Sequence, residues 1–332
     1  MTQNDIAAVV VTYNRCELLR KNIECLLNQK GTQCDIYVID NASTDQTQDM
    51  VRSFTDSRVH YFNTGGNLGG AGGFEWGMRQ AAEDGYRLLW LMDDDTLPSP
   101  SALHELIEAG AKLGDNWGAL SSAAYWVDNS VCNMNRQKPT LFSHVKDSDI
   151  MNRELIPVIQ ASFVSLLLKS EAVREIGLPY GEYFIWTDDL EYTLRLSQHH
   201  KIYVVPKSSV VHAMKDNRRP NFAVDAPDRL ARYRYLYRND VHCYSQYGLQ
   251  GWIYLAVKFT YTALNVLLHS KGHKLEKLGV LVNGFKEGFS FRPELRRITD
   301  GGGGQQNNFL VVAVVCVYRL HDSCNEELEA AA

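Results

Sequence analysis

Short apolar runs alternate with stretches of helical spacing over the first hundred residues, and this alternation restricts the fold more than any other feature. Six runs rich in valine, isoleucine and aromatic residues recur, at residues 6–13, 35–40, 59–63, 87–92, 158–168 and 201–205. Between the first four lie segments with apolar residues every three or four positions, at 16–29, 46–54 and 74–83. The alternation predicts an α/β fold with a mainly parallel sheet covered by helices on both faces. In such sheets, ligands bind beyond the carboxyl ends of the strands.

The pattern changes after the last strand run. Three helices are predicted at residues 228–246, 252–268 and 274–289. Residues 201–300 carry 17 Lys and Arg against 8 Asp and Glu, whereas residues 1–200 carry 16 against 27, so the basic charge is concentrated late in the chain. This indicates a polyanionic partner, such as an anionic membrane surface or a phosphate-bearing acceptor. No motif supports nucleic acid as that partner.

The changes in apolar pattern and in charge divide the chain into three parts. We expect a catalytic part at residues 1–225, a basic helical region at 226–300 and a linker-like tail at 301–332. Within the tail, residues 309–318 form a short apolar run that fits an edge strand. The middle predicted helix is apolar but contains Lys258 and Asn265. Ordinary packing and an interfacial position on a membrane both fit this helix better than a membrane span does.

The composition is that of a folded protein, since 45% of the residues are hydrophobic and 22% are charged. Seven cysteines without a Cys-x-x-Cys pair favour reduced thiols over a disulfide framework or a zinc site. The first residues lack the basic and apolar segments of a secretory signal. We therefore expect a cytoplasmic protein, with a peripheral position at the inner face of the cell membrane as an open alternative.

Polar residues follow the first two strand runs. Residues 10–15 read Val-Val-Thr-Tyr-Asn-Arg, and residues 40–45 read Asp-Asn-Ala-Ser-Thr-Asp. A carboxylate and hydroxyls at adjacent strand ends can accept the N–H of a pyrimidine ring and the hydroxyls of a ribose. Helix capping by Asn14 and by Thr44 or Asp45 is the alternative. Capping does not account for Asp40, which lies too far ahead of its helix.

A glycine-rich segment follows the third strand run, with six glycines between residues 65 and 73. Such a loop allows close backbone approach to a ligand, and its N–H groups can face a phosphate. The dinucleotide motif Gly-x-Gly-x-x-Gly, begun at Gly70, requires glycine where Glu75 stands. A nicotinamide-dependent dehydrogenase is therefore excluded, while a flexible structural loop remains the alternative.

Three consecutive carboxylates, Asp93, Asp94 and Asp95, close the fourth strand run. Their mutual repulsion costs stability unless a cation is bound there. Alternate residues of a strand point to the same side, so we expect Asp93 and Asp95 together and Asp94 opposite. This pair can bind a hard divalent ion that also takes diphosphate oxygens. A solvated acidic turn is the alternative.

Two further carboxylates, Asp188 and Asp189, stand at the start of a predicted helix that runs to about residue 198. Neighbouring carboxylates push each other's pKa values apart, so one of them can serve as a general base toward a hydroxyl. Helix capping explains one of them but not both together with Glu191. His212 follows the last strand run, where its imidazole could complete a metal shell. A lone strand-end histidine is otherwise usually structural.

These five motifs, in this order, resemble the family-two inverting glycosyltransferases with a GT-A nucleotide-diphospho-sugar fold and here a helical C-terminal extension. The resemblance spans residues 6 to 212. The segment around Asn67 and the paired Asp188 and Asp189 resemble bacterial galactofuranosyltransferases and rhamnosyltransferases that build cell-surface polysaccharides. The chain lacks the long N-terminal β-domain of the mycobacterial polymerising galactofuranosyltransferase, which argues against a processive polymerase.

The resemblance implies roles for individual residues. Asp189 would be the catalytic base, with Asp188 beside it. Asp93, Asp95 and His212 would bind Mn²⁺ or Mg²⁺ on the donor diphosphate. The nucleotide-sugar donor would be held by Thr12, Tyr13, Asn14, Arg15, Asp40, Asn67, Gly72, Asp94 and Trp186.

The expected function is transfer of a sugar, galactofuranose or rhamnose, from a UDP- or dTDP-sugar to a glycan or lipid-diphosphate-linked acceptor. A nucleotidyltransferase is the alternative enzyme, but it usually has a glycine- and basic-rich loop directly after the first strand. A non-catalytic scaffold on the same fold is the other alternative, and it would lack one of these carboxylates.

Overall fold

The computed structural model describes residues 5–141 and 143–298. The predicted tail at 301–332, with its edge strand at 309–318, lies outside the described residues. Within them the strands are β1 (Ile6–Thr12), β2 (Asp35–Asp40), β3 (Val59–Asn63), β4 (Leu88–Asp93), β5 (Thr96–Pro98), β6 (Ala119–Tyr125), β7 (Ile156–Val158), β8 (Leu166–Lys169) and β9 (Ile202–His212).

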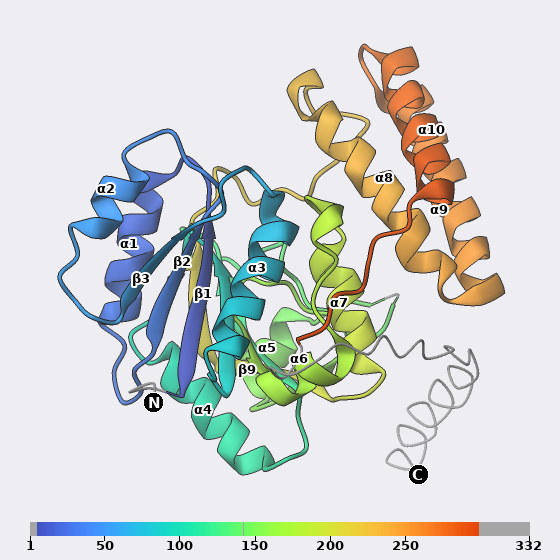
Figure 1. Cartoon of the computed structure of the whole chain (residues 1–332). Helices are drawn as coiled ribbons and strands as arrows, with labels where there is room; N and C mark the ends of the chain where they lie inside the picture. The colour runs from blue at the N-terminus through green and yellow to red at the C-terminus, as the bar shows by residue number, and fades with distance from the viewer. Residues whose placement is uncertain (1–4, 142, 299–332) are drawn as a thin grey trace, which may run out of the picture.

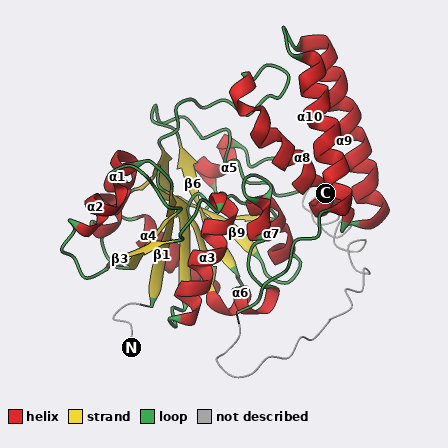
Figure 2. Cartoon of the chain, turned by 45° about the horizontal axis from the view of Figure 1, so that its top comes forward, coloured by secondary structure: helices red, strands yellow, loops and turns green. Residues whose placement is uncertain are grey.

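Helices α1 to α7 lie around the strands, and the last three helices form a group beside them (Figures 1 and 2). They are α1 (Cys16–Leu27), α2 (Thr47–Arg52), α3 (Gly69–Glu83), α4 (Ala102–Leu113), α5 (Asp147–Asn152), α6 (Ser170–Ile176), α7 (Asp188–Ser197), α8 (Leu230–Ser245), α9 (Gly248–His269) and α10 (Lys274–Ser290).

One sheet joins the strands in the order β3-β2-β1-β4-β8-β6-β9-β5, with β7 paired to β9. The pairings from β3 to β4 are parallel, as the alternation predicts. The sheet becomes mixed where β8 runs antiparallel between β4 and β6. The α/β class is confirmed, and the carboxyl ends of β1, β2 and β4 meet at one edge.

Strand β1 is buried on both faces. Ala7, Val9 and Val11 pack into the core beneath α3, while Ala8 and Val10 pack into the core beneath α1 and α4. This division follows from the two-residue period of a strand. It explains why the run at residues 6–13 is apolar throughout rather than alternating.

The single strand predicted at residues 158–168 is wrong. The structure has β7 and β8 instead, separated by a loop in which Ser165 has a φ of +61°. This left-handed conformation interrupts a strand. The Ser165 hydroxyl accepts a hydrogen bond from Trp90 Nε1 at 2.9 Å, so the interruption is held in the core.

The glycine-rich segment is part loop and part helix, because α3 begins at Gly69. A Cβ at Gly73 would lie 2.5 Å from Val11 Cγ1, and a Cβ at Gly77 would lie 2.5 Å from Val9 Cγ1. These two glycines therefore allow α3 to pack closely on β1. Gly65, Gly66 and Gly70 have open space where a Cβ would stand.

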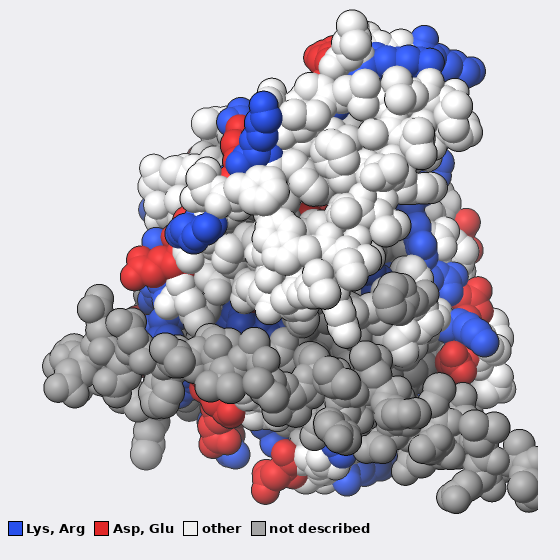
Figure 3. All heavy atoms as spheres, turned by 90° about the vertical axis from the view of Figure 1, so that its right-hand side faces the viewer, with Lys and Arg blue, Asp and Glu red and all other residues white. Residues whose placement is uncertain are grey.

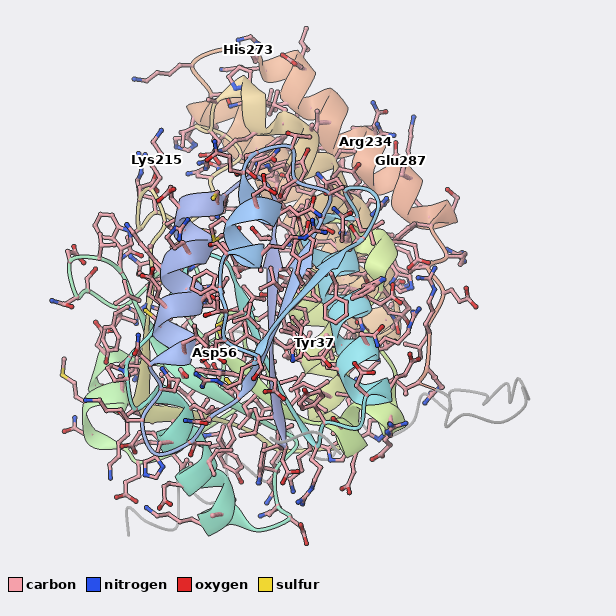
Figure 4. The ribbon with its side chains drawn as sticks, turned by 60° about the vertical axis from the view of Figure 1, so that its left-hand side comes forward. Tyr37, Asp56, Lys215, Arg234, His273 and Glu287 are labelled. Atoms are coloured by element: carbon pink, nitrogen blue, oxygen red, sulfur yellow. The ribbon has the colours of Figure 1, made fainter. Side chains whose placement is uncertain are left out.

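The three predicted C-terminal helices are present as α8, α9 and α10, which pack against one another beside the sheet (Figure 1). Their apolar contacts centre on Tyr233, Tyr237 and Leu281. Arg234 on α8 and Glu287 on α10 point toward each other on the outer side of this bundle (Figure 4), with Arg234 Nη2 2.6 Å from Glu287 Oε1.

Candidate active site

The ends of β1 and β4 are joined by polar contacts. Thr12 Oγ1 donates a hydrogen bond to Asp94 Oδ2 at 2.7 Å. Arg15 Nη1 bridges Asp94 Oδ1 at 3.2 Å and Asp95 Oδ2 at 2.7 Å. Burial raises the pKa of Asp94 to about 7, against the opposing effect of Arg15. The half-exposed Arg15 is therefore one of the groups that balance the negative charge at this edge.

Asp40 lies at the neighbouring strand end and is completely buried. Tyr61 donates its hydroxyl to Asp40 Oδ2 at 2.7 Å, and the Ser43 N–H donates to Asp40 Oδ1 at 2.8 Å. Asp40 thus orders the loop after β2. The structure places it beside Thr12, since the two residues are paired across β1 and β2.

Asn14 connects the loops after β1 and β2. Its Oδ1 accepts from the backbone N–H of Thr44 at 2.7 Å, and its own N–H donates to Ser43 Oγ at 2.8 Å. Asn14 does not cap α1 through its side chain; instead the Cys16 N–H at the start of α1 donates to Asp45 Oδ2 at 3.1 Å. Tyr13 is exposed at the same edge.

Asn67 and Gly72 stand at the start of α3. Asn67 Oδ1 accepts the Gly69 N–H at 2.9 Å, which fixes the entry into the helix. A Cβ at Gly72 would lie 2.6 Å from Leu68 Cβ. Gly69 has a φ of +72°, and a Cβ there would collide with the Phe184 carbonyl oxygen, so the helix start lies against the segment before α7.

Asp93, Asp95 and His212 come together as a candidate metal site. Each offers one ligand atom, and these atoms lie within 4.8 Å of one another. Two carboxylate oxygens and an imidazole nitrogen are donors that suit Mn²⁺ or Mg²⁺ when diphosphate oxygens and water complete the shell. The donor set therefore fits the metal that the sequence motifs imply.

The sequence pattern predicts that the three carboxylates continue the extended strand, but the backbone turns after Asp93. Asp94 and Asp95 form a turn between β4 and β5. Strand β5 then pairs antiparallel with β9, with Thr96 opposite His212. This pairing brings the histidine to the acidic turn.

The charges of the candidate metal site are coupled. Burial and the neighbouring Asp95 raise the pKa of Asp93 to about 6, with a smaller contribution from Asp189. Burial would lower the pKa of His212, but its hydrogen bond and charge interaction with Asp95 raise it to about 10. His212 Nε2 lies 3.0 Å from Asp95 Oδ1, so without a metal these two groups form an ion pair.

Asn135 is a residue of this site that carries no sequence motif. Its Oδ1 lies 2.7 Å from His212 Nδ1, and its Nδ2 donates to Ser162 Oγ at 3.1 Å. A partner on one ring nitrogen fixes the ring and directs the other nitrogen to a metal. Asn135 thus orients His212 Nε2 toward Asp93 and Asp95.

Asp188 and Asp189 are the first two residues of α7. Burial, and then the charge of Asp189, raise the pKa of Asp188 well above its ordinary value. Burial raises the pKa of Asp189 to about 6, while the Leu190 N–H bond to its Oδ1 and the charge of Lys138 oppose the rise. The pKa of Asp188 is thus raised further than that of Asp189, so Asp189 is the member of the pair that ionises more readily.

Trp186 packs among the C-terminal helices. Its ring centroid lies 4.9 Å from that of Tyr233 on α8, with the planes 62° apart. The ring is partly buried in the same cluster as Tyr237 and Leu281. A role for Trp186 in holding the nucleotide-sugar donor stays a prediction.

A mixed α/β sheet with a candidate cation site, an acidic pair and ordered loops at its strand ends is the arrangement expected of a glycosyltransferase of GT-A architecture. The chain matches the family described as glycosyl transferase family 2 over residues 7–176, slightly more than half of its length. The chain belongs to this family and is a glycosyltransferase. The nucleotidyltransferase and scaffold alternatives are thereby set aside.

Among curated relatives, the chain is 28% identical over 210 residues to the galactofuranosyltransferase GlfT1 of Mycolicibacterium smegmatis, covering 59% of this chain and 67% of that protein. It is 36% identical over 110 residues to the undecaprenyl-phosphate mannosyltransferase of Micrococcus luteus, covering 31% and 43%. The crystal structure of S. aureus TarS 1–349 aligns with a TM-score of 0.48 and 14% identity, covering 86% and 72%. The chain thus spans at most about two thirds of the length of these curated relatives.

Proposed function

We propose that this protein is a metal-dependent inverting hexosyltransferase that moves galactofuranose or rhamnose from a UDP- or dTDP-sugar to a glycan or lipid-linked acceptor in cell-surface polysaccharide synthesis. The observation that carries the proposal is the convergence of Asp93, Asp95 and His212 beside the Asp188 and Asp189 pair. Relatives named as a galactofuranosyltransferase and an undecaprenyl-phosphate mannosyltransferase support sugar transfer to a lipid-linked acceptor.

Asp93, Asp95 and His212 would hold Mn²⁺ or Mg²⁺ against the donor diphosphate. When bound, such an ion stabilises the negative charge that grows on the leaving nucleoside diphosphate. Arg15 lies within reach of two of the three consecutive carboxylates and adds fixed positive charge at the same edge. Thr12 and Asp40 stand at the adjoining strand ends, where the nucleoside would be bound.

Asp189 would take the proton of the acceptor hydroxyl. Its pKa is about 6 and the pKa of Asp188 is raised further, so Asp189 is the better candidate for the ionised base. As the proton leaves, the acceptor oxygen attacks the anomeric carbon from the face opposite the leaving group. The C–O bond to the nucleoside diphosphate breaks, the configuration inverts and no covalent sugar intermediate on the enzyme is needed.

The decisive experiment is a calorimetric binding panel of UDP, dTDP, GDP and CDP, each with and without Mn²⁺, followed by transfer assays with the sugar conjugates. Manganese-dependent binding of UDP favours a galactofuranose donor, and binding of dTDP favours rhamnose. Binding of none of the four would contradict the proposal.

The C-terminal helices carry a surface that suits an anionic membrane. Helix α9 is long and apolar enough to cross a bilayer by length and composition, and 17% of its most apolar window is buried. Exposed apolar residues follow one another along it, including Ile253, Val257, Tyr261 and Leu268. Figure 3 shows this face as a broad uncharged expanse with Lys and Arg at its upper edge.

Two observations favour a peripheral position over a span. Lys258 lies within α9, and its Nζ is 2.6 Å from Asp240 Oδ2 on α8, so one side of the helix is bound to protein. Exposed Lys271 and Lys274 stand at the turn between α9 and α10, where they can meet anionic headgroups. We place the protein in the cytoplasm at the inner membrane face.

Vesicle sedimentation tests this position. We expect salt-sensitive binding to vesicles containing anionic lipid and weaker binding to neutral vesicles. Leu268→Glu should reduce it, while Met151→Glu on α5 serves as the matched control because Leu268 and Met151 are 74% and 79% exposed. Equal binding by the two variants would contradict the membrane surface on α9.

A further inference from the structure

The segment that leads into the acidic pair has an unusual backbone. Phe184, Trp186 and Thr187 have φ values of +64°, +64° and +67°. Residues other than glycine adopt this left-handed region at an energetic cost, and they keep it only where surrounding contacts hold them. Thr187 directly precedes Asp188, so this strained segment sets where α7 begins.

Helix α8 supplies the contacts that hold the segment. Asn239 is completely buried, and its Nδ2 lies 3.0, 3.2 and 2.9 Å from the carbonyl oxygens of Tyr183, Ile185 and Trp186. Arg238 donates to Asn239 Oδ1 through Nε at 3.0 Å, which fixes the orientation of the amide. The same guanidinium donates to the Tyr183 carbonyl through Nη2 at 3.2 Å.

The next residue of α8, Asp240, contacts Thr187, which directly precedes α7. Asp240 Oδ1 accepts the Thr187 hydroxyl at 3.3 Å, and Asp240 Oδ2 pairs with Lys258 Nζ at 2.6 Å. Asp240 is 2% exposed, so its charge depends on Lys258 for compensation. Three consecutive residues of α8, Arg238, Asn239 and Asp240, therefore bind the segment at 183–187.

We propose that Asn239 is a positioning residue for the transfer reaction, which holds the strained segment so that Asp189 faces the acceptor hydroxyl. The proposal rests on the proposed function of Asp189 as the base. Asn239 bonds to backbone carbonyls alone within this segment, so it acts through the placement of α7 rather than on substrate. Helix α8 is accordingly part of the catalytic apparatus.

Asn239→Leu tests the proposal because leucine has a similar volume and no hydrogen-bonding atoms. Val241→Ala is the matched control, since Val241 is 1% exposed on the same helix and lies in an apolar cluster with Leu255 and Leu190 that includes no residue of the strained segment. Both variants lose stability, so assays are run well below their melting temperatures. We measure kcat for transfer, the donor Kd in the presence of Mn²⁺ and amide hydrogen exchange over residues 183–187.

In Asn239→Leu we expect kcat to fall by about 10- to 100-fold, as misplacement of a catalytic group does. The donor Kd should stay close to that of the wild type, and exchange over 183–187 should rise. Val241→Ala should change neither kcat nor this exchange. A kcat for Asn239→Leu no lower than that of Val241→Ala, or a parallel loss of kcat and donor affinity, would overturn the proposal.

The experiments distinguish failure of the proposed function from failure of the positioning proposal. A wild-type protein that transfers no sugar removes the catalytic role of Asp189, whereas unchanged exchange in Asn239→Leu removes the positioning by Asn239. Should Asn239→Leu not fold, Thr187→Val removes only the hydroxyl bond to Asp240. It should lower kcat without a change in donor Kd, and an unchanged kcat in that variant would count against the proposal.

Discussion

The strongest prediction concerns the pH dependence of the candidate base. Burial raises the pKa of Asp189 to about 6, while Lys138 opposes the rise. A base must be ionised to accept a proton, so turnover should fall as the pH decreases through this value. Asp189→Asn cannot ionise, and we expect it to lose about 100- to 10,000-fold in kcat, the usual contribution of a general base.

The size of the pH effect follows from the pKa. With a pKa of about 6, the ionised fraction of Asp189 is about nine tenths at pH 7 and about one tenth at pH 5. We therefore expect kcat to fall about tenfold between these two pH values. The assay uses saturating Mn²⁺ and donor, because metal binding keeps Asp93 ionised over the same range.

Lys138→Met distinguishes titration of Asp189 from a nonspecific loss of activity at low pH. Removing the positive charge should raise the pKa of Asp189, so the variant should lose a larger share of its maximal kcat at pH 6 than the wild type does. Lys112→Met on α4 is the control, since Lys112 is exposed and is not among the groups that act on Asp189. A flat profile between pH 5 and 7, or identical profiles for Lys138→Met and the wild type, would refute the assignment of Asp189 as the titrating base.

Two further predictions concern binding of the metal and packing of the sheet. Asn135→Ala should weaken Mn²⁺ binding by about 10- to 100-fold through loss of the imidazole orientation at His212, and calorimetry showing wild-type affinity would exclude this role. Gly77→Ala should reduce the free energy of unfolding in urea by about 1–3 kcal/mol, because the new Cβ would meet Val9. Gly70→Ala is its control, with open space at the Cβ position and an expected change within about 0.5 kcal/mol; equal losses for both would argue against close packing of α3 on β1.

The sequence predicts the first half of the sheet well because its signal is local. Strands β2 and β3 have the bounds expected from their apolar runs, and the buried faces of β1 require the continuous apolar pattern that identifies it. The glycine-rich segment gives a less specific signal. Gly73 and Gly77 are four residues apart, a helical spacing that indicates packing, while the cluster of glycines around them also favours a phosphate-binding loop.

The candidate metal site could be predicted from local sequence patterns only in part. The acidic triplet and His212 are visible in the sequence, but the strand pairing that unites them is not. Strand β5 has three residues, too few for a recognisable run, and its antiparallel register with β9 is what places His212 next to Asp95. Asn135 lies in a long connection without apolar periodicity, so only the folded chain reveals its contact with the histidine ring.

The segment before the candidate base is bound by residues that the predicted domain boundary assigns to the C-terminal region. The boundary at residue 225 follows a change in composition, yet the backbone before Asp188 is bound by Asn239 and Asp240 from beyond it. Because Lys258 on α9 neutralises Asp240, the helix that carries the exposed apolar face is also linked to the start of α7. A membrane or lipid-linked acceptor that contacts α9 would therefore act on the same buried network that we propose to position Asp189. On these proposals, the basic region would support the candidate base as well as offer a surface to an acceptor.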